Sequence, residues 1–128
     1  MKYFFAITIA LLCKTQVIAQ QIDKFKSTTL TMETLENGVW VNKGTKEYST
    51  TIIFDYTSEK IKLFINKNVE FDIVNIKDEL NSIFFKVNDP DGNECDFEIT
   101  SITFEGKIIG LIRLYTSNNT YSFTVNKI

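Results

Sequence analysis

Carboxylates are the side chains whose type and spacing could support chemistry in this chain. Glu70 and Asp72, like Asp96 and Glu98, stand two residues apart, so each pair lies on one face of an extended strand. Paired carboxylates hydrolyse glycosides when they face each other across a cleft in distinct environments. Nothing in the sequence distinguishes either pair in that way, and both alternate with apolar residues, as on a solvated strand face. A hydrolase working on carboxylates alone is therefore the least favoured of three functional hypotheses.

Four oxygen-bearing side chains gather around one predicted turn and form a weak calcium candidate: Asp89, Asp91, Asn93 and Asp96. The arrangement departs from the EF-hand loop, because Thr100 stands where the bidentate glutamate belongs and strands are predicted on both sides. An Asp-Pro-Asp-Gly turn uses such residues for its own geometry. We therefore expect no metal site and no cofactor.

The absence of histidine excludes many chemistries. It removes Ser/His/Asp and Cys/His catalysis, histidine-ligated haem and most zinc sites. Cys95 is the only cysteine beyond residue 13, so no intrachain disulfide is expected, and its alternation with Phe97 and Ile99 favours a buried, inert thiol. We expect the protein not to be an enzyme.

The charges argue against a nucleic-acid partner. The formal net charge is −2, and thirteen of the fourteen basic residues are lysines, with Arg113 the only arginine. Without Lys2 and Lys14, twelve basic groups face sixteen acidic ones, a net charge of −4. Acidic domains with almost no arginine are a poor match for phosphates and base edges.

The N-terminus is typical of a secretory signal peptide. Lys2 precedes an apolar run over residues 3–13, and Val17-Ile18-Ala19 resembles a small-residue cleavage site. The run is too short to span a bilayer and no second one follows, so no integral membrane segment is expected in the mature chain. We predict a signal peptide over residues 1–19 and an exported protein that is periplasmic, attached to the cell surface or secreted. Lipidation of Cys13 is the alternative, although Leu12 stands where lipoprotein signals carry a small residue.

Residues 20–128 are expected to form a single all-β domain. Turn signals recur at intervals of about ten residues between stretches of alternating polarity, a pattern typical of a small barrel or sandwich. Asn37-Gly38 is the strongest hairpin signal, and the apolar set changes faces near Thr100-Ser101, which predicts a β-bulge or sharp bend there. Residues 20–26 are expected to form a short helix or arm, and residues 77–81 could hold one helical turn. The prediction is an antiparallel meander of about eight strands in a small barrel or strongly curled sheet, with strand candidates at 28–35, 39–41, 48–56, 60–65, 69–73, 82–87, 95–104, 108–115 and 120–125.

Two functional hypotheses follow from the faces of these strands. The leading one is non-enzymatic binding of a small apolar ligand inside the barrel, because eight strands enclose an interior that side chains just fill or that holds one such ligand. The other is a protein-interaction or self-associating module with a filled core, because several apolar residues face outward. Under this second hypothesis the protein could form a homo-oligomer. The ligand candidates are Trp40, Phe54, Phe71, Phe85 and Phe97, and the interaction candidates are Phe64, Phe84, Ile109 and Leu111.

Gly38-Val39-Trp40 resembles the Gly-x-Trp signature of the lipocalins and related calycin barrels. The resemblance implies a small secreted β-barrel that binds a ligand and whose tryptophan closes the base of the barrel. It covers these three residues and the general meander. This chain differs in that a strand at 28–35 precedes the motif and the expected mature length of about 109 residues is short for the family. The alternative is an ordinary core or edge tryptophan in a hairpin.

Overall fold

The computed structural model describes residues 21–65 and 67–128. The predicted signal peptide and Cys13 lie outside these residues. No described residue is helical, and among the described residues no helix is long and apolar enough to cross a membrane.

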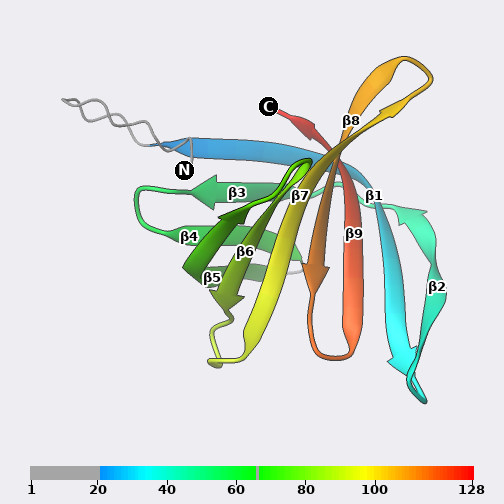
Figure 1. Ribbon diagram of the computed structural model, residues 1–128, viewed down its shortest axis with the longest axis horizontal. Coiled ribbons are helices and arrows are strands. Elements are labelled where there is room, and N and C mark those ends of the chain that lie inside the picture. The colour runs from blue at the N-terminus through cyan, green and yellow to red at the C-terminus, as the bar shows by residue number, and fades with distance from the viewer. Residues whose placement is uncertain (1–20, 66) are drawn as a thin grey trace.

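The protein is an antiparallel β-barrel, which confirms the predicted fold class (Figure 1). The strands follow one another around the sheet, and β1 closes it by pairing with β9 on one edge and β3 on the other. Eight strands form the closed ring, and β2 is an extra strand that pairs only with β1 within the described part of the chain. The strands are β1 Ile22–Glu36, β2 Val39–Glu47, β3 Thr51–Asp55, β4 Lys60–Ile65, β5 Lys67–Asp78, β6 Ser82–Asn88, β7 Glu94–Phe104, β8 Lys107–Tyr115 and β9 Asn119–Lys127.

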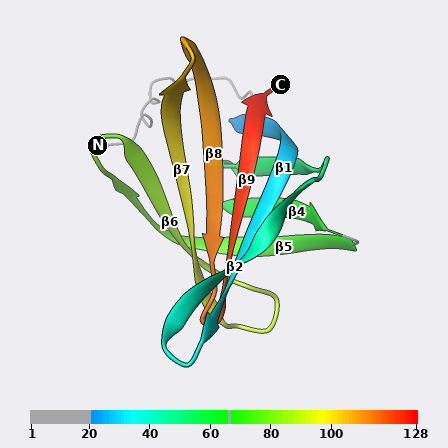
Figure 2. The same cartoon turned by 90° about the vertical axis from the view of Figure 1, so that its right-hand side faces the viewer.

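Strand β1 serves both the barrel and the extra hairpin. Its first residues pair with β3 as far as Lys26, and its last residues, from Thr29 on, pair with β2 along the same edge. The β1–β2 hairpin therefore extends past the barrel, and Figure 2 shows β2 bending away from the wall at its lower end. Asn37 and Gly38 have φ angles of 51° and 79°, as a type I′ turn requires, so the predicted hairpin turn is confirmed.

The predicted bulge near Thr100-Ser101 is wrong. The β7–β8 register is unbroken from Asp96 to Phe104, and the register shifts lie in β1, at Ser27/Thr29 and Thr31/Glu33, and in β5, at Ile73/Asn75. Beyond Thr100, the last partner of β6, strands β7 and β8 project from the barrel as a hairpin (Figure 1).

Neither short helix is present. Residues from Ile22 onward belong to β1, and β5 continues through Asp78 before the chain bends towards β6. Both segments are strands because they pair with β3 and β6, and their own sequences do not reveal these partners.

Phenylalanine rings fill the middle of the barrel. Phe54 lies with its ring centroid 5.0 Å from Phe85 and 6.1 Å from Phe97, and Phe71 lies 5.1 Å from Phe97. All four are buried, within a continuous core to which every strand of the closed ring contributes. Cys95 belongs to this core, and burial raises the pKa of its thiol, which fits the inert role expected of it.

Candidate ligand-binding site

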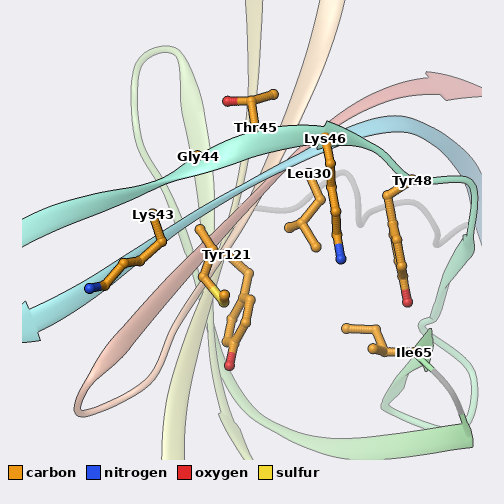
Figure 3. Close-up of a pocket in the computed structure, with 9 residues that line it drawn as sticks. Leu30, Lys43, Gly44, Thr45, Lys46, Tyr48, Ile65 and Tyr121 are labelled. Atoms are coloured by element: carbon orange, nitrogen blue, oxygen red, sulfur yellow. The ribbon is translucent and has the colours of Figure 1, made fainter.

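A hollow of about 380 Å³ lies at one end of the barrel, between β2 and the adjoining ends of the wall. Its apolar side chains are Leu30 and Met32 from β1, Ile65 from the end of β4, and the ring of Tyr121 from β9 (Figure 3). Leu30 is buried while Met32 is 36% exposed, so the hollow runs from the core towards solvent. The remaining lining residues are Lys43, Gly44, Thr45, Lys46 and Tyr48.

Strand β2 supplies one side of the hollow because of its register with β1. Lys46 pairs with Leu30, which places both side chains on the same face of the hairpin. Figure 3 shows Lys46 and Tyr48 pointing the same way, alongside the hollow and towards the level of Ile65. The Lys46 Nζ lies 5.5 Å from the centroid of the Tyr48 ring, a cation–π contact that holds the amine beside the opening.

A bulge in β2 opposite Met32 bends this strand. Thr31 pairs with Thr45 but Glu33 pairs with Asn42, so β2 carries an extra residue in this interval. Gly44 has a φ of 112°, which favours glycine, and its N–H donates to the Asn42 Oδ1 at 2.7 Å. The Asn42 amide group thereby holds the bulge that shapes the hollow.

Two buried hydroxyl groups position the corner between β2 and β3. Ser27 donates to the carbonyl of Tyr48 at 2.6 Å and accepts from the N–H of Thr50 at 2.9 Å. The Thr50 hydroxyl donates to the carbonyl of Phe64, next to Ile65. Ser27 and Thr50 are 2% and 8% exposed. Tyr48 and Ile65, which both line the hollow, are thus held in place by hydrogen bonds that no sequence motif predicts.

None of the predicted ligand residues lines this hollow. Phe54, Phe71, Phe85 and Phe97 contact one another in the core, whereas Trp40 is 46% exposed and lines a different hollow. Trp40 pairs with Leu35 beyond the end of the closed ring. It therefore does not close the base of the barrel, as the lipocalin resemblance implied. Alternation identifies core positions, whereas the residues around the hollow lie at strand ends and in a corner.

The predicted interaction residues do not form one patch. Phe64, Phe84 and Leu111 lie on β4, β6 and β8, with Ile109 also on β8, and each of these strands is separated from the next by another strand. Phe64 and Phe84 pair with β5 residues nine positions apart, which corresponds to about 30 Å along the strand. Phe64 is exposed, and the other three are half-buried. The self-association hypothesis therefore has no continuous apolar surface behind it at these positions.

The calcium candidate is a hydrogen-bonded turn. Asp89 Oδ1 accepts from the N–H groups of Asp91 and Asn93 at 2.9 and 2.8 Å, and these bonds, that of Asn93 above all, hold the pKa of Asp89 below its usual value. No group of three or more histidine, cysteine or acidic side chains within the described residues could hold a metal ion. The Asp89 carboxylate thus shapes the turn.

The carboxylate pairs take part in surface contacts. Asp72 forms an ion pair with Lys60 at 2.6 Å on the exposed wall. Glu98 accepts from the hydroxyl groups of Tyr115 and Ser82 at 2.7 and 3.0 Å. These contacts satisfy both carboxylates in a structural role.

The comparisons with known proteins place the chain in no family. No protein-family model matches the sequence, and the comparison with curated proteins gave no match. One solved structure that is similar in part is HpuA from Kingella denitrificans, determined in complex with human haemoglobin. The identity is 11%, the TM-score is 0.35, and the alignment covers 82% of this chain and 41% of the HpuA chain. A likeness at this level indicates neither a common ligand nor a common partner.

Proposed function

We propose that the protein binds a small apolar ligand, without transforming it, in the hollow at the end of the barrel. One observation carries the proposal: the barrel is filled by phenylalanine rings in its middle but is open at this end, over apolar side chains. The volume of about 380 Å³ lies within the range of small-molecule sites, which are mostly apolar with a few polar groups. The proposal replaces the four core phenylalanines with Leu30, Met32, Ile65 and Tyr121 as the contact residues.

The polar groups of the site lie beside the opening. Lys46 brings an ammonium group, and Tyr48 and Tyr121 bring phenol groups, while the buried end is formed by Leu30. A ligand would therefore place its apolar part against Leu30 and Met32 and any polar end towards solvent. Such an arrangement gives orientation through few hydrogen bonds and affinity through apolar burial.

The proposal includes export from the cell. The N-terminal sequence, with Lys2 before an apolar run and Val17-Ile18-Ala19 after it, supports a cleaved signal peptide. Mass spectrometry of the protein purified from its own host should show a mature chain that begins at Gln20. A chain that retains Met1 would contradict this part of the proposal.

Fluorescence titration with N-phenyl-1-naphthylamine, an uncharged apolar probe, tests the site. The wild-type chain should give a saturable increase in emission with one probe bound per chain. Met32→Glu and Ile65→Glu should each weaken binding by about tenfold or more, because an unpaired carboxylate would have to lose its hydration beside the ligand. Val74→Glu is the matched control, since Val74 is 58% exposed on β5 and does not line the hollow. Equal affinities in all four proteins, or emission that never saturates, would refute the proposal.

A further inference from the structure

A second hollow, of about 540 Å³, lies on the outer face of the wall and is separate from the barrel mouth. It extends across β2, β1, β9 and β8, with Trp40 at one side and Arg113 and Tyr115 at the other. Glu33 and Ser122 line it between them. Because side chains alternate along β1, Glu33 faces this outer hollow while Met32 faces the mouth.

The outer hollow is lined by an exposed indole, that of Trp40. Trp40 is the only tryptophan of the chain, and it is 46% exposed although it is the largest apolar side chain available to a core. Its neighbours in the hollow include the only arginine, Arg113, and the half-buried Leu111. A flat aromatic face beside hydrogen-bonding groups is a binding surface for a ligand that has one apolar face and polar edges.

This hollow has no excess of positive charge. Arg113 lies 3.5 Å from Glu98, whose carboxylate also accepts from Tyr115, so its positive charge is already partly balanced. Glu33 adds a further negative charge. An anionic ligand would meet little attraction here, whereas the guanidinium N–H groups, the Glu33 carboxylate and the Ser122 hydroxyl offer donors and acceptors to neutral hydroxyl groups.

On β1, β9 and β8, the backbone beneath the hollow is already paired. Thr31, Glu33, Ser122 and Arg113 belong to the continuous β2-β1-β9-β8 sheet, in which each strand pairs with the next. An extended peptide lying across these strands would find no free main-chain groups to pair with. Recognition must therefore come from side chains, through one aromatic face and several hydrogen bonds.

We propose that this outer hollow binds a neutral oligosaccharide. A hexose ring has an apolar C–H face, which would lie on the Trp40 indole, and a rim of hydroxyl groups, which would meet Arg113, Glu33 and Ser122. The combination of an exposed aromatic face, no excess of positive charge and several hydrogen-bonding side chains matches this chemistry. The proposal is independent of the ligand site at the barrel mouth.

Tryptophan fluorescence tests the proposal directly, because Trp40 is the only indole and lines only the outer hollow of the two. Maltohexaose and chitotetraose are the neutral probes, and a sulfated heparin tetrasaccharide is the anionic control. At least one neutral probe should change the emission saturably below about 10 mM, and the sulfated one should not. No saturable change with either neutral probe, or a change with the sulfated one alone, would overturn the proposal.

Three side-chain variants and one matched control locate the binding. Glu33→Gln and Arg113→Ala should each weaken the binding of the responding sugar by about tenfold. Trp40→Ala, measured by calorimetry because it removes the fluorophore, should abolish it. Phe64→Ala, on the outer face of β4, should change nothing, and N-phenyl-1-naphthylamine should bind all four variants equally. Sugar binding that survives both Glu33→Gln and Trp40→Ala would place it elsewhere and refute the assignment.

Discussion

Ser27→Ala should destabilise the barrel more than its small change in size suggests. The hydroxyl joins β1 to the corner between β2 and β3 by donating to the Tyr48 carbonyl and accepting from the Thr50 N–H. Ser27 is 2% exposed, so alanine would leave both backbone groups without that partner in a largely dry site. A buried polar group that loses its partner costs about 1–3 kcal/mol, and water can reach the half-buried Tyr48 side. We therefore expect a loss of about 2–4 kcal/mol in the free energy of unfolding.

Urea denaturation measures this loss. With a slope of about 2 kcal/mol per molar urea, the midpoint should fall by about 1–2 M without a change in slope. Thr28→Ala is the matched control, because the Thr28 side chain is exposed and its hydroxyl makes only a long bond of 3.3 Å to the Thr124 carbonyl. This control should lose less than about 0.5 kcal/mol.

The same substitution tests how the ligand site is positioned. Without the Ser27 hydroxyl, Tyr48 loses one of the bonds that hold it beside the hollow, so the affinity for N-phenyl-1-naphthylamine should fall in protein that remains folded. A free-energy loss no larger than that of Thr28→Ala would show that the corner does not depend on Ser27. Unchanged probe affinity in a clearly destabilised Ser27→Ala protein would show that the corner does not position the ligand site.

Three further predictions concern packing and ionisation. Gly110→Ala should lower the melting temperature, because its β-carbon would lie 3.0 Å from the Val125 Cγ2 and 3.3 Å from the Val125 carbonyl oxygen. Val125 is 1% exposed, and overpacking against such a residue costs about 1–3 kcal/mol. This cost exceeds the gain of about 0.4–1 kcal/mol from a stiffer unfolded chain. The Ser58 hydroxyl is the main group that holds the pKa of Asp55 below its usual value. The contribution of the Asp55 carboxylate to stability is therefore present above the unfolded pKa of about 4 and is lost as the pH falls through the folded pKa. As the pH is lowered from about 5, urea midpoints should fall less steeply in Asp55→Asn than in the wild type, about one unit of pH above the unfolded pKa being the start of the loss. Burial, followed by the nearby Asp23 carboxylate, raises the pKa of Tyr56. The contribution of the neutral Tyr56 phenol to stability is therefore complete below about pH 10 and is lost as the pH rises further. In an ultraviolet titration, the phenol that ionises last in the wild type should be missing from Tyr56→Phe.

The strand faces could be predicted from the sequence because burial follows a period of two. Ile52 and Phe54 of β3 and Ile61 and Leu63 of β4 are buried, as their alternation with polar residues indicates. The turn at Asn37-Gly38 was equally readable, since few residues adopt positive φ at low cost. These features are local, and each is encoded within a few residues of itself.

The closure of the barrel and the extent of β2 could not be predicted, because both depend on distant partners. The pairing of β1 with β9 joins the two ends of the described chain. Residues 42–47 of β2 are polar and include Gly44, so they show no alternation, and they form a strand only because β1 continues beside them. Both candidate sites depend on this segment or on Trp40 just before it, which explains why strand phases alone assigned the site residues to the core.

The irregular structure of β2 both opposes aggregation and shapes the proposed ligand site. Within the described residues, β2 is the one strand that pairs with a single neighbour, so its whole outer edge is unpaired, and such edges attract further strands. The bulge at Gly44, the bond from its N–H to Asn42, and the charges of Lys43 and Lys46 all oppose regular pairing along this edge. Lys43, Gly44 and Lys46 also line the hollow at the barrel mouth. In β2, the irregularity that protects an exposed edge therefore also shapes the proposed ligand site, and loss of this protection and loss of the site should follow from the same substitutions.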